Sequence, residues 1–390
     1  MLNICIIVQN YYKIDPRVRR TAELLVNTGY SVDVFCLRNE DENKKNYHLN
    51  GVNVFTAPLS KKRASNLRYI FEYLAFFLLT VLFLTRQTQK KRYELIHVNT
   101  LPDFLVYAGL VHKIFGTTII LDMHEVMPEF YMSKFGVPMN HILIKLIKWQ
   151  ERVSIRFADQ VITINEPIKI LLENRNTIKN KITVVMNSVD NSLFSLPESR
   201  INNNSDNKFI FMYHGTLTRL YGLDIAIRAF SKAAHQMPNA NFWMLGEGSE
   251  RSNLEQLSKD LDINEKVKFL GVHPQQDMVE WLSRCDVGVL PTRQDVFSDL
   301  SFSNKLPEYI VMKKPVIVSR LKTIRYYFSD EALAFFEPHN EEDLAQQMIH
   351  IYNIPELRQS LVSKALIEYQ SINWKVMQQR YLSLIDRITA

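Results

Sequence analysis

Residues 211–230, FMYHGTLTRLYGLDIAIRAF, contain the pattern that decides the fold. An apolar run typical of a buried strand ends at Gly215, and a short loop then leads into a segment with helical spacing. A phosphate can approach glycine closely because glycine has no Cβ. Arg219 in the loop could hold such a phosphate with its fork of donors. A single strand–glycine–helix unit is weak evidence, but the chain repeats it.

The same alternation runs through the second half of the chain. LGEGSER (245–251) is again the end of an apolar run, a glycine loop and the start of a helical segment. Expected strands are 209–213, 241–245, 266–270, 286–290, 315–318 and 333–336, with helices near 221–236, 250–261, 275–284, 304–312, 322–329 and 341–350. Apolar strands separated by helices are typical of a parallel sheet covered on both faces.

The first half shows this alternation as well. Expected strands are 3–8, 31–37, 51–56, 94–98, 117–122, 160–164 and 182–186, with helices near 17–29, 67–92, 103–115, 139–158 and 166–174. The polar, Asn-rich run PESRINNNSDNK separates the halves and is the expected linker.

The sequence thus predicts two doubly wound α/β domains, 1–196 and 209–372, joined by a linker at 197–208. A helix at 373–390 either packs back on the first domain or caps the second. Ligands bind at the carboxyl ends of strands in such folds, so both sets of loops should face a central cleft.

Composition narrows the class of protein. With 390 residues, 46% hydrophobic and 23% charged, the chain is neither disordered, collagen-like nor a polytopic membrane protein. Residues 1–195 carry 25 Lys and Arg against 17 Asp and Glu, a balance of +8, whereas the remaining 22 against 24 give −2. The first half is therefore expected to meet an anionic lipid, nucleic acid or phosphorylated substrate. Interleaved aromatic and basic residues are missing from the sequence, which disfavours nucleic acid.

Cysteine usage and the N-terminus bear on the compartment. Cys5, Cys36 and Cys285 are odd in number and far apart, so neither a disulfide framework nor a zinc site is indicated. A reducing cytosol fits best, and MLNICIIVQN resembles a buried strand rather than a signal peptide.

A helix start is expected within SFSNKLPEYIVMKKPVIVS (301–319). Ser301 or Ser303 could cap this helix, and Pro307 is tolerable in its first turn. The free N–H groups of a helix start suit a diphosphate. Lys305 adds a cation, and Glu308 could accept hydrogen bonds from a ribose diol. The plainer alternative is that Lys305 and Glu308 are a solvated pair.

Residues 69–85, YIFEYLAFFLLTVLFLT, allow three interpretations. A spanning helix is disfavoured, because it would place strands of one sheet on opposite sides of a bilayer. A buried crossover helix and a surface helix that touches lipid both remain open. The flanking cations favour anionic lipid; they are Lys61, Lys62, Arg63 and Arg68 before the run and Arg86, Lys90, Lys91 and Arg92 after it.

The three runs of the second half, in this order and spacing, resemble glycosyltransferase family 4. NSVDNSLF (187–194), DPRVRRTAELLVNTGYSVDVF (15–35) and LDMHEVMPEF (121–130) resemble further parts of that family, so the resemblance covers nearly the whole chain. It implies the GT-B fold, with two Rossmann-like domains facing a cleft. It also implies retaining transfer from a nucleotide-sugar donor without a bound metal.

Site residues follow from matched positions. The resemblance implies that Glu308 holds the donor ribose, and that Arg219, Lys305 and the backbone of Ser303 and Asn304 lie near the donor phosphates. His124 would lie beside the donor sugar, and Gly271 and Val272 would meet the base. Gly215, Thr216 and Gly246 complete the expected donor site.

The chain departs from the family at three places. A first glutamate usually precedes Glu308, but Leu300 stands there, so the neighbouring Asp299 is the candidate replacement. Tyr221 stands where a lysine usually precedes Gly222. QNYYKIDPRVRR replaces the glycine pair after the first strand, so Arg17 or Arg20 could serve instead.

Arg17, Asp103 and Glu125 are the candidate acceptor contacts. A helix N-cap is the alternative for Asp103, and loop capping is the alternative for His124. A metal cluster of Asp122, His124 and Glu125 is disfavoured, because these residues lie along one strand end with no further ligand indicated.

The expected function is metal-independent transfer of a hexose or N-acetylhexosamine to a lipid-linked or surface-polysaccharide hydroxyl. A UDP-sugar is favoured over a GDP-sugar as donor, and no cofactor is expected. The expected location is cytoplasmic, on the inner face of the membrane through residues 61–92. A GT-B sugar-nucleotide epimerase and a non-catalytic partner in glycan synthesis are the alternatives.

Overall fold

The computed structural model describes residues 2–39, 46–61, 66–189, 194, 208–274 and 277–389. The chain divides into two compact units, Met1–Asn187 with Met377–Ala390, and Ser188–Val376. The predicted linker lies outside the described residues except for Lys208. The second unit already begins at Ser188, because Ser188 Oγ donates to the carbonyl of Ile372 at 2.5 Å and Val189 N donates to the Tyr369 hydroxyl at 3.2 Å.

The first unit is built on an eight-stranded sheet of order β3-β4-β2-β1-β5-β6-β7-β8. The strands are β1 Asn3–Val8, β2 Ser31–Leu37, β3 Asn46–Leu49, β4 Val52–Ala57, β5 Leu95–Asn99, β6 Thr118–Met123, β7 Gln160–Thr163 and β8 Ile182–Val184. Every neighbouring pair is parallel except β3 and β4, which are antiparallel. The parallel sheet predicted for this half thus carries one antiparallel strand at its edge. The short edge strand β3 carries no apolar run that would reveal it, because a strand at the edge need not be buried on both faces.

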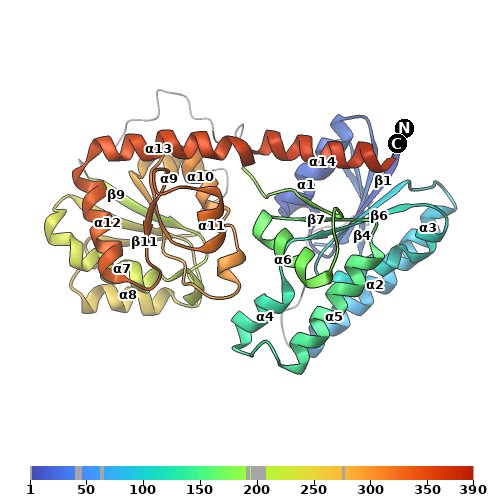
Figure 1. Cartoon of the computed structure of the whole chain (residues 1–390), viewed down its shortest axis with the longest axis horizontal. Helices are drawn as coiled ribbons and strands as arrows, with labels where there is room; N and C mark the ends of the chain where they lie inside the picture. The colour runs from blue at the N-terminus through green and yellow to red at the C-terminus, as the bar shows by residue number, and fades with distance from the viewer. Residues whose placement is uncertain are drawn as a thin grey trace. The chain divides into compact units, whose positions relative to one another are not determined.

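Helices cover both faces of this sheet (Figure 1). They are α1 Pro16–Asn27, α2 Asn66–Thr88, α3 Leu110–Ile114, α4 Met127–Phe135, α5 Ile142–Phe157, α6 Glu166–Asn176 and α14 Trp374–Thr389, with 3-10 turns η1 Tyr12–Ile14 and η2 Asp103–Gly109. The single helix expected at 103–115 is thus a 3-10 segment followed by a short α-helix. Helix α4 was not predicted, although Pro128 in its first turn and Gly136 at its end, with φ +63°, are ordinary boundary signals.

The C-terminal helix α14 belongs to the first unit from Met377 onward. Tyr381, Leu384 and Ile385 are buried in the core that β1, β2 and α1 form. Tyr30 donates a hydrogen bond to Asp386 at 3.1 Å, and Figure 1 shows α14 beside α1. Burial of such side chains contributes roughly 1.5–3 kcal/mol each.

The second unit is a six-stranded parallel sheet of order β11-β10-β9-β12-β13-β14. Its strands are β9 Phe209–His214, β10 Ala240–Leu245, β11 Val267–Gly271, β12 Val287–Leu290, β13 Val316–Ser319 and β14 Ala334–Phe336. Its helices are α7 Leu223–Ala233, α8 Arg251–Asp260, α9 Met278–Arg284, α10 Lys305–Val311, α11 Lys322–Tyr327, α12 Glu341–Asn353 and α13 Pro355–Tyr369, with 3-10 turns η5 Arg219–Tyr221, η6 Ala234–Gln236, η8 Ser298–Leu300 and η9 Gln370–Ile372. The strand order reverses between β9 and β12, which is where doubly wound sheets bind ligands.

Candidate active site

The loops after β9 and β10 meet through glycines. Gly215 and Gly246 have φ of +123° and +140°, which favour glycine. A Cβ on Gly246 would stand 1.9 Å from the Gly215 carbonyl oxygen, and one on Gly248 would stand 2.2 Å from the Leu217 carbonyl oxygen. The two loops pack backbone against backbone, so these glycines cannot take a side chain without moving the loops.

A pocket of about 280 Å³ opens at these loops. Its lining consists of His214, Gly215, Thr216, Leu245, Gly246, Glu247, Val272, His273 and Met278. The structure thereby brings together Gly215, Thr216, Gly246 and Val272, four of the predicted donor residues. Gly271 is the next residue along, and its carbonyl accepts a hydrogen bond from Gly246 N at 2.6 Å.

Lys305 at the start of α10 crosses over Gly215. A Cβ on Gly215 would stand 2.2 Å from Lys305 Cε, so glycine leaves the path of this side chain open. Lys305 Nζ lies 4.3 Å from the ring centre of Tyr221 and 5.5 Å from that of Tyr213. The aromatic residue that replaces the family's lysine therefore holds a cation over its ring.

His214, Lys305 and Glu308 form a titratable group beside the pocket, in which His214 is buried and the other two side chains are half-buried. Glu308 Oε2 lies 3.3 Å from His214 Nε2. Burial raises the pKa of Glu308 to about 7, and the charge of Lys305 opposes that shift. Burial lowers the pKa of Lys305 to about 8, and burial together with the Lys305 charge lowers that of His214 to about 3. The histidine is thus neutral. Removing the charges of Lys305 and Glu308 from water costs free energy, which a bound ligand of complementary charge and hydrogen bonding would offset.

The helix start carries no side-chain cap. The N-cap of α10 is Asn304, and no side chain among the described residues caps the helix. The expectation that Ser301 or Ser303 would do so was wrong, because Ser301 Oγ instead donates to the Phe297 carbonyl at 2.9 Å. Pro307 lies in the first turn, as predicted.

The remaining donor candidates lie on neighbouring loops. Arg219 is exposed in η5, and Asn304 is exposed at the start of α10. Asp299 lies in η8, where its carboxylate accepts from Gln294 Nε2 at 3.1 Å and from Lys322 N at 3.2 Å. Those two donors fix the orientation of the Asp299 carboxylate. Its role as a substitute for the missing glutamate stays a prediction.

We expect donor affinity to have a maximum between about pH 7 and pH 8. Below about pH 7 Glu308 takes up a proton and stops accepting as a carboxylate, and above about pH 8 Lys305 loses its charge. Calorimetric titration with an intact UDP-sugar measures this profile. Glu308→Gln should remove the acidic limb and move the alkaline limb to lower pH, because the Glu308 charge raises the pKa of Lys305. An acidic limb that persists in Glu308→Gln would assign it to another group.

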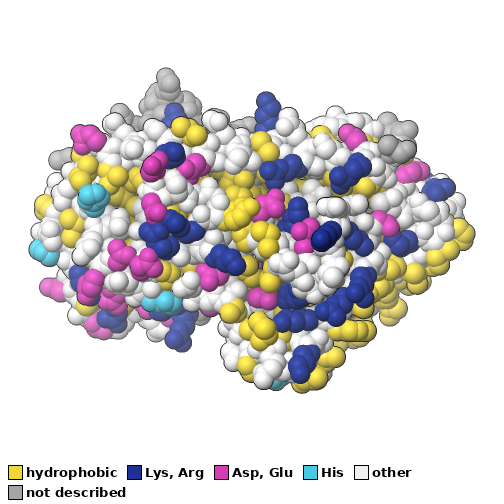
Figure 2. Space-filling view, viewed as in Figure 1, with side chains coloured by type: hydrophobic (Ala, Val, Ile, Leu, Met, Phe, Trp, Pro, Cys, Tyr) yellow, Lys and Arg dark blue, Asp and Glu magenta, His cyan; other side chains and the backbone are white. Residues whose placement is uncertain are grey.

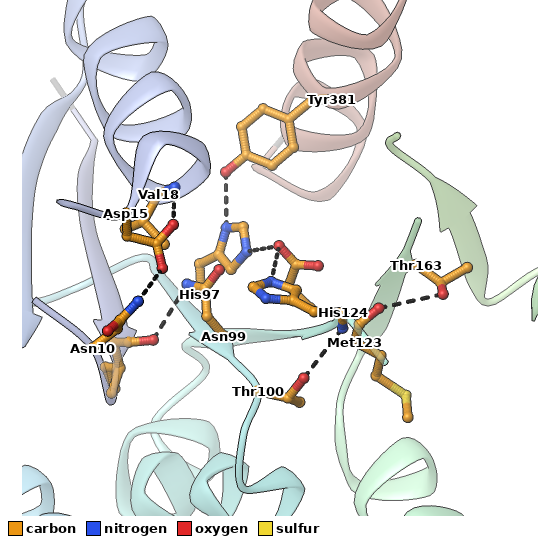
Figure 3. Close-up of polar contacts among 12 residues, drawn as sticks. Asn10, Asp15, Val18, His97, Asn99, Thr100, Met123, His124, Thr163 and Tyr381 are labelled. Atoms are coloured by element: carbon orange, nitrogen blue, oxygen red, sulfur yellow. Dashed lines mark hydrogen bonds and ion pairs between the residues drawn. The ribbon is translucent and has the colours of Figure 1, made fainter. Parts of the chain in front are cut away.

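A second polar group lies at the carboxyl ends of β5 and β6 in the first unit (Figure 3). Asp122 Oδ2 lies 3.2 Å from His124 Nε2 and 3.2 Å from His97 Nε2. The Tyr381 hydroxyl of α14 lies 2.9 Å from His97 Nδ1, and the backbone N–H of His124 donates to Thr100 Oγ1 at 3.2 Å. The backbone of His124 is therefore bonded to Thr100, and its ring lies against Asp122.

Tyr381 donates into this network. Burial and the charge of Asp122 raise the pKa of Tyr381 well above its usual value, so the phenol keeps its proton and donates a hydrogen bond to His97 Nδ1. His97 Nε2 lies 3.2 Å from Asp122 Oδ2, and His124 Nε2 lies at the same distance from that oxygen.

Arg17 and Glu125 are close enough to interact electrostatically, and the charge of Asp122 also acts on Arg17. Burial lowers the pKa of Arg17, and the charges of Asp122, Asp15 and Glu125 oppose that shift. Burial raises the pKa of Glu125, opposed by Arg17 and Lys134. Within the described part of the chain the buried Nε of Arg17 has no hydrogen-bond partner.

Asp103 does not lie at a surface where an acceptor could bind. Its side chain is 2% exposed, and burial, with the nearby charge of Glu151, raises its pKa to about 7. It does not cap a helix either, because the N-cap of η2 is Pro102. Both expectations for Asp103 were wrong, since packing of α5 over η2 buries the carboxyl group.

Sequence patterns did not reveal His214, Glu247, His273, His97 or Tyr381. A signal existed for His214, which directly precedes Gly215 at the end of an apolar run. Tyr381 lies 284 positions from His97 in the chain, so no local pattern connects them. Among the described residues no group of three or more His, Cys, Asp or Glu could hold a metal ion.

Comparison with known proteins identifies the family. The family model for Glycosyltransferase Family 4 matches residues 16–193, and that for Glycosyl transferases group 1 matches residues 196–366. The chain is a family 4 glycosyltransferase. An uncharacterized glycosyltransferase of Methanocaldococcus jannaschii is 24% identical over 372 residues, covering 90% of this chain and 88% of the relative.

Solved structures agree with the GT-B fold of this glycosyltransferase. Sucrose-phosphate synthase from Thermosynechococcus elongatus superposes with a TM-score of 0.80 at 17% identity, covering 100% of this chain and 99% of that one. Anabaena HepE in complex with UDP superposes with a TM-score of 0.72 at 15% identity, covering 99% of this chain and 100% of that one. At these identities the likeness shows the fold.

Proposed function

We propose that this glycosyltransferase transfers a hexose or N-acetylhexosamine from a UDP-sugar to a hydroxyl of a lipid-linked or surface-polysaccharide acceptor, with retention at the anomeric carbon. The observation that carries the donor assignment is the half-buried Lys305–Glu308 pair beside the pocket that the glycine loops line. A diphosphate would supply an anion for Lys305, and a ribose diol would supply hydroxyl donors for the Glu308 carboxylate. The UDP bound by Anabaena HepE, of the same fold, supports a UDP-sugar.

Each donor group has a proposed contact. Glu308 accepts from the ribose diol, Lys305 and Arg219 hold the phosphates, and the N–H groups near Ser303 and Asn304 add to them. Gly215, Thr216 and Gly246 allow close approach, Gly271 and Val272 meet the base, and Asp299 is the candidate contact to the sugar.

The chemical step follows from charge. The bond from the anomeric carbon to the diphosphate oxygen breaks, and UDP leaves with its electron pair. The acceptor hydroxyl oxygen forms the new bond, and its proton passes to the leaving diphosphate. Negative charge grows on the leaving diphosphate, so cations and helix N–H groups stabilise the transition state. His124 is proposed to orient a hydroxyl of the sugar or acceptor, and Arg17 and Glu125 are proposed to contact the acceptor.

Helix α2 supports a membrane-bound acceptor. Phe76, Thr80 and Leu84 are buried, whereas Ile70, Phe71, Leu74, Leu78 and Leu82 are each more than half exposed. The expectation of a wholly buried crossover helix was therefore wrong. Ile70–Thr88 is long and apolar enough to cross a membrane by length and composition. It nevertheless connects β4 and β5 of one sheet, which disfavours a crossing.

We propose that residues 61–92 bind an anionic membrane surface on its cytoplasmic side. Arg86, Lys90 and Arg92 are exposed at the end of the segment, and Lys61 is exposed at its start. Lys62 and Arg63, which the sequence also assigned to this role, lie outside the described residues. Each such cation contributes on the order of 1 kcal/mol near an anionic bilayer.

Release of UDP from a UDP-sugar, with and without a lipid-linked acceptor, tests the function. We expect acceptor-stimulated release by the wild type. A non-catalytic partner would release none, and an epimerase would interconvert the sugar without needing an acceptor.

Activity should persist in excess chelator, because Lys305, Arg219 and the helix start neutralise the diphosphate without a metal. UDP release is measured with and without EDTA. Complete loss that magnesium or manganese restores would contradict this expectation.

A further inference from the structure

Helix α5 carries a line of exposed apolar side chains along one face. Ile142, Leu146 and Trp149 are each more than half exposed, and their spacing of four and three residues places them on one face of the helix. Ile144, Ser154 and Ile155 are buried on the other side. The exposed line is therefore not what packs α5 onto its unit.

The same edge of the first unit carries more exposed apolar residues. Ile114 and Phe115 at the end of α3 are exposed, as is the line on α2. Helices α2, α3 and α5 all pack against η2. Figure 2 shows hydrophobic side chains along the edge where Figure 1 places α2, α3 and α5, next to a cluster of Lys and Arg.

The exposed charges on α5 are of one sign. Lys145, Arg152 and Arg156 are exposed and Lys148 is partly exposed. The one acidic residue of this helix, Glu151, is buried, where Arg175 Nε lies 3.2 Å from its Oε1. An apolar line flanked by cations, with no exposed acid on the helix, is the pattern of a helix that lies in a membrane interface.

We propose that α5 is a second lipid-binding element, and that it joins α2 and the end of α3 in one surface that binds an anionic bilayer. We call this surface the lipid face; it comprises Ile70, Phe71, Leu74, Leu78, Leu82, Ile114, Phe115, Ile142, Leu146 and Trp149. The inference rests on the membrane partner of the proposed function and adds a contact outside residues 61–92. It leaves the donor chemistry untouched.

Charge decides between a bilayer and a second copy of the chain. Two lipid faces pressed together would bring the cations of one α5 against those of the other, which is unfavourable. An anionic headgroup layer is complementary to the same cations, and its acyl region takes up the apolar line. Two lines on different helices also fix the orientation of the unit on the bilayer, which a single helix does not.

The lipid face lies near the histidine network in the fold. Segment η2, on which its helices pack, also packs against β6, the strand that ends at Met123. His124 follows directly, and α4 connects that loop to α5. A bilayer at the lipid face would therefore present a lipid-linked acceptor to the unit that carries His124.

Vesicle binding of the full-length enzyme tests the proposal. We expect co-sedimentation with phosphatidylcholine–phosphatidylglycerol vesicles, little with phosphatidylcholine alone, and weakening as salt rises. The variant Ile142→Ser/Leu146→Ser/Trp149→Ser should bind at least tenfold more weakly, as should Lys145→Gln/Lys148→Gln/Arg152→Gln. UDP release in solution should stay unchanged in both. Exposed Ile170 on α6 and Ile367 on α13 supply the matched control, Ile170→Ser/Ile367→Ser, which should bind like the wild type.

Fluorescence locates the contact on α5 directly. Brominated acyl chains should quench part of the tryptophan emission of the wild type, and Trp149→Phe should remove that quenching while keeping most of the binding. Unchanged vesicle binding by the serine variant of α5, or equal quenching in Trp149→Phe, would overturn the proposal. A wild-type dimer that the serine variant converts to a monomer would overturn it in favour of a second copy. Vesicle binding without UDP release would instead contradict the proposed function alone.

Discussion

Glu308→Ala is expected to lower kcat/KM for the donor roughly 30- to 1,000-fold, which corresponds to about 2–4 kcal/mol of transition-state stabilisation. The carboxylate is largely enclosed beside Lys305 and His214, where loss of an acceptor for two ribose hydroxyls leaves those hydroxyls unpaired. UDP release under limiting donor measures the effect. Glu308→Gln, which keeps the shape and one acceptor oxygen, should lose less than Glu308→Ala.

Glu368→Ala is the matched control for this loss. The Glu368 side chain has the same 20% exposure as that of Glu308, and it accepts hydrogen bonds from Ser329 on the second unit, outside the donor pocket. It should lower stability and leave the kcat/KM of the folded enzyme unchanged. Turnover of Glu308→Ala equal to that of the wild type would remove the proposed donor site.

Gly246→Ala is expected to abolish UDP binding and to lower the free energy of unfolding of the second unit by about 3 kcal/mol or more. The added Cβ would stand 1.9 Å from the Gly215 carbonyl oxygen, and the φ of +140° is strained for alanine. Because the obstacle is backbone rather than a flexible side chain, the loop that carries Gly215 and Thr216 has to move. Denaturant unfolding and calorimetry with UDP measure the two effects.

Gly29→Ala is the control that separates the cost of backbone strain from the steric overlap expected in Gly246→Ala. Gly29 also has a positive φ, +94°, but a Cβ there would meet nothing within 4 Å. It should cost about 1–2 kcal/mol and leave UDP affinity unchanged. Wild-type UDP affinity in Gly246→Ala would show that the contact between the two loops does not shape the donor pocket.

The elements that build the pocket of the glycine loops were largely predictable, because they are local in sequence. Each glycine follows an apolar run, and Lys305 and Glu308 lie one turn apart on a single helix, so strand, loop and helix patterns located them. The sequence could not predict the pKa values of Glu308 and Lys305. The pKa values near 7 and 8 for Glu308 and Lys305 depend on burial by surrounding chain, which no spacing reveals.

The network of His97, Asp122 and Tyr381 could not be predicted, because its residues come from distant parts of the chain. His97 and Asp122 pair because β5 and β6 are neighbours in the sheet, and Tyr381 reaches His97 only because α14 packs on the first unit. Asp103 failed as an acceptor contact for a related reason, since the covering helix α5 comes from a later part of the chain.

By itself the amino-acid sequence determined the α/β class, most strand and helix positions and the family, because hydrophobic periodicity and glycine placement act over short distances. Tertiary structure alone decided which side of α2 faces outward, which unit holds α14, which carboxyl groups are buried and which side of α5 is exposed. These properties depend on contacts between residues far apart in the chain, and packing, not local pattern, selects those contacts.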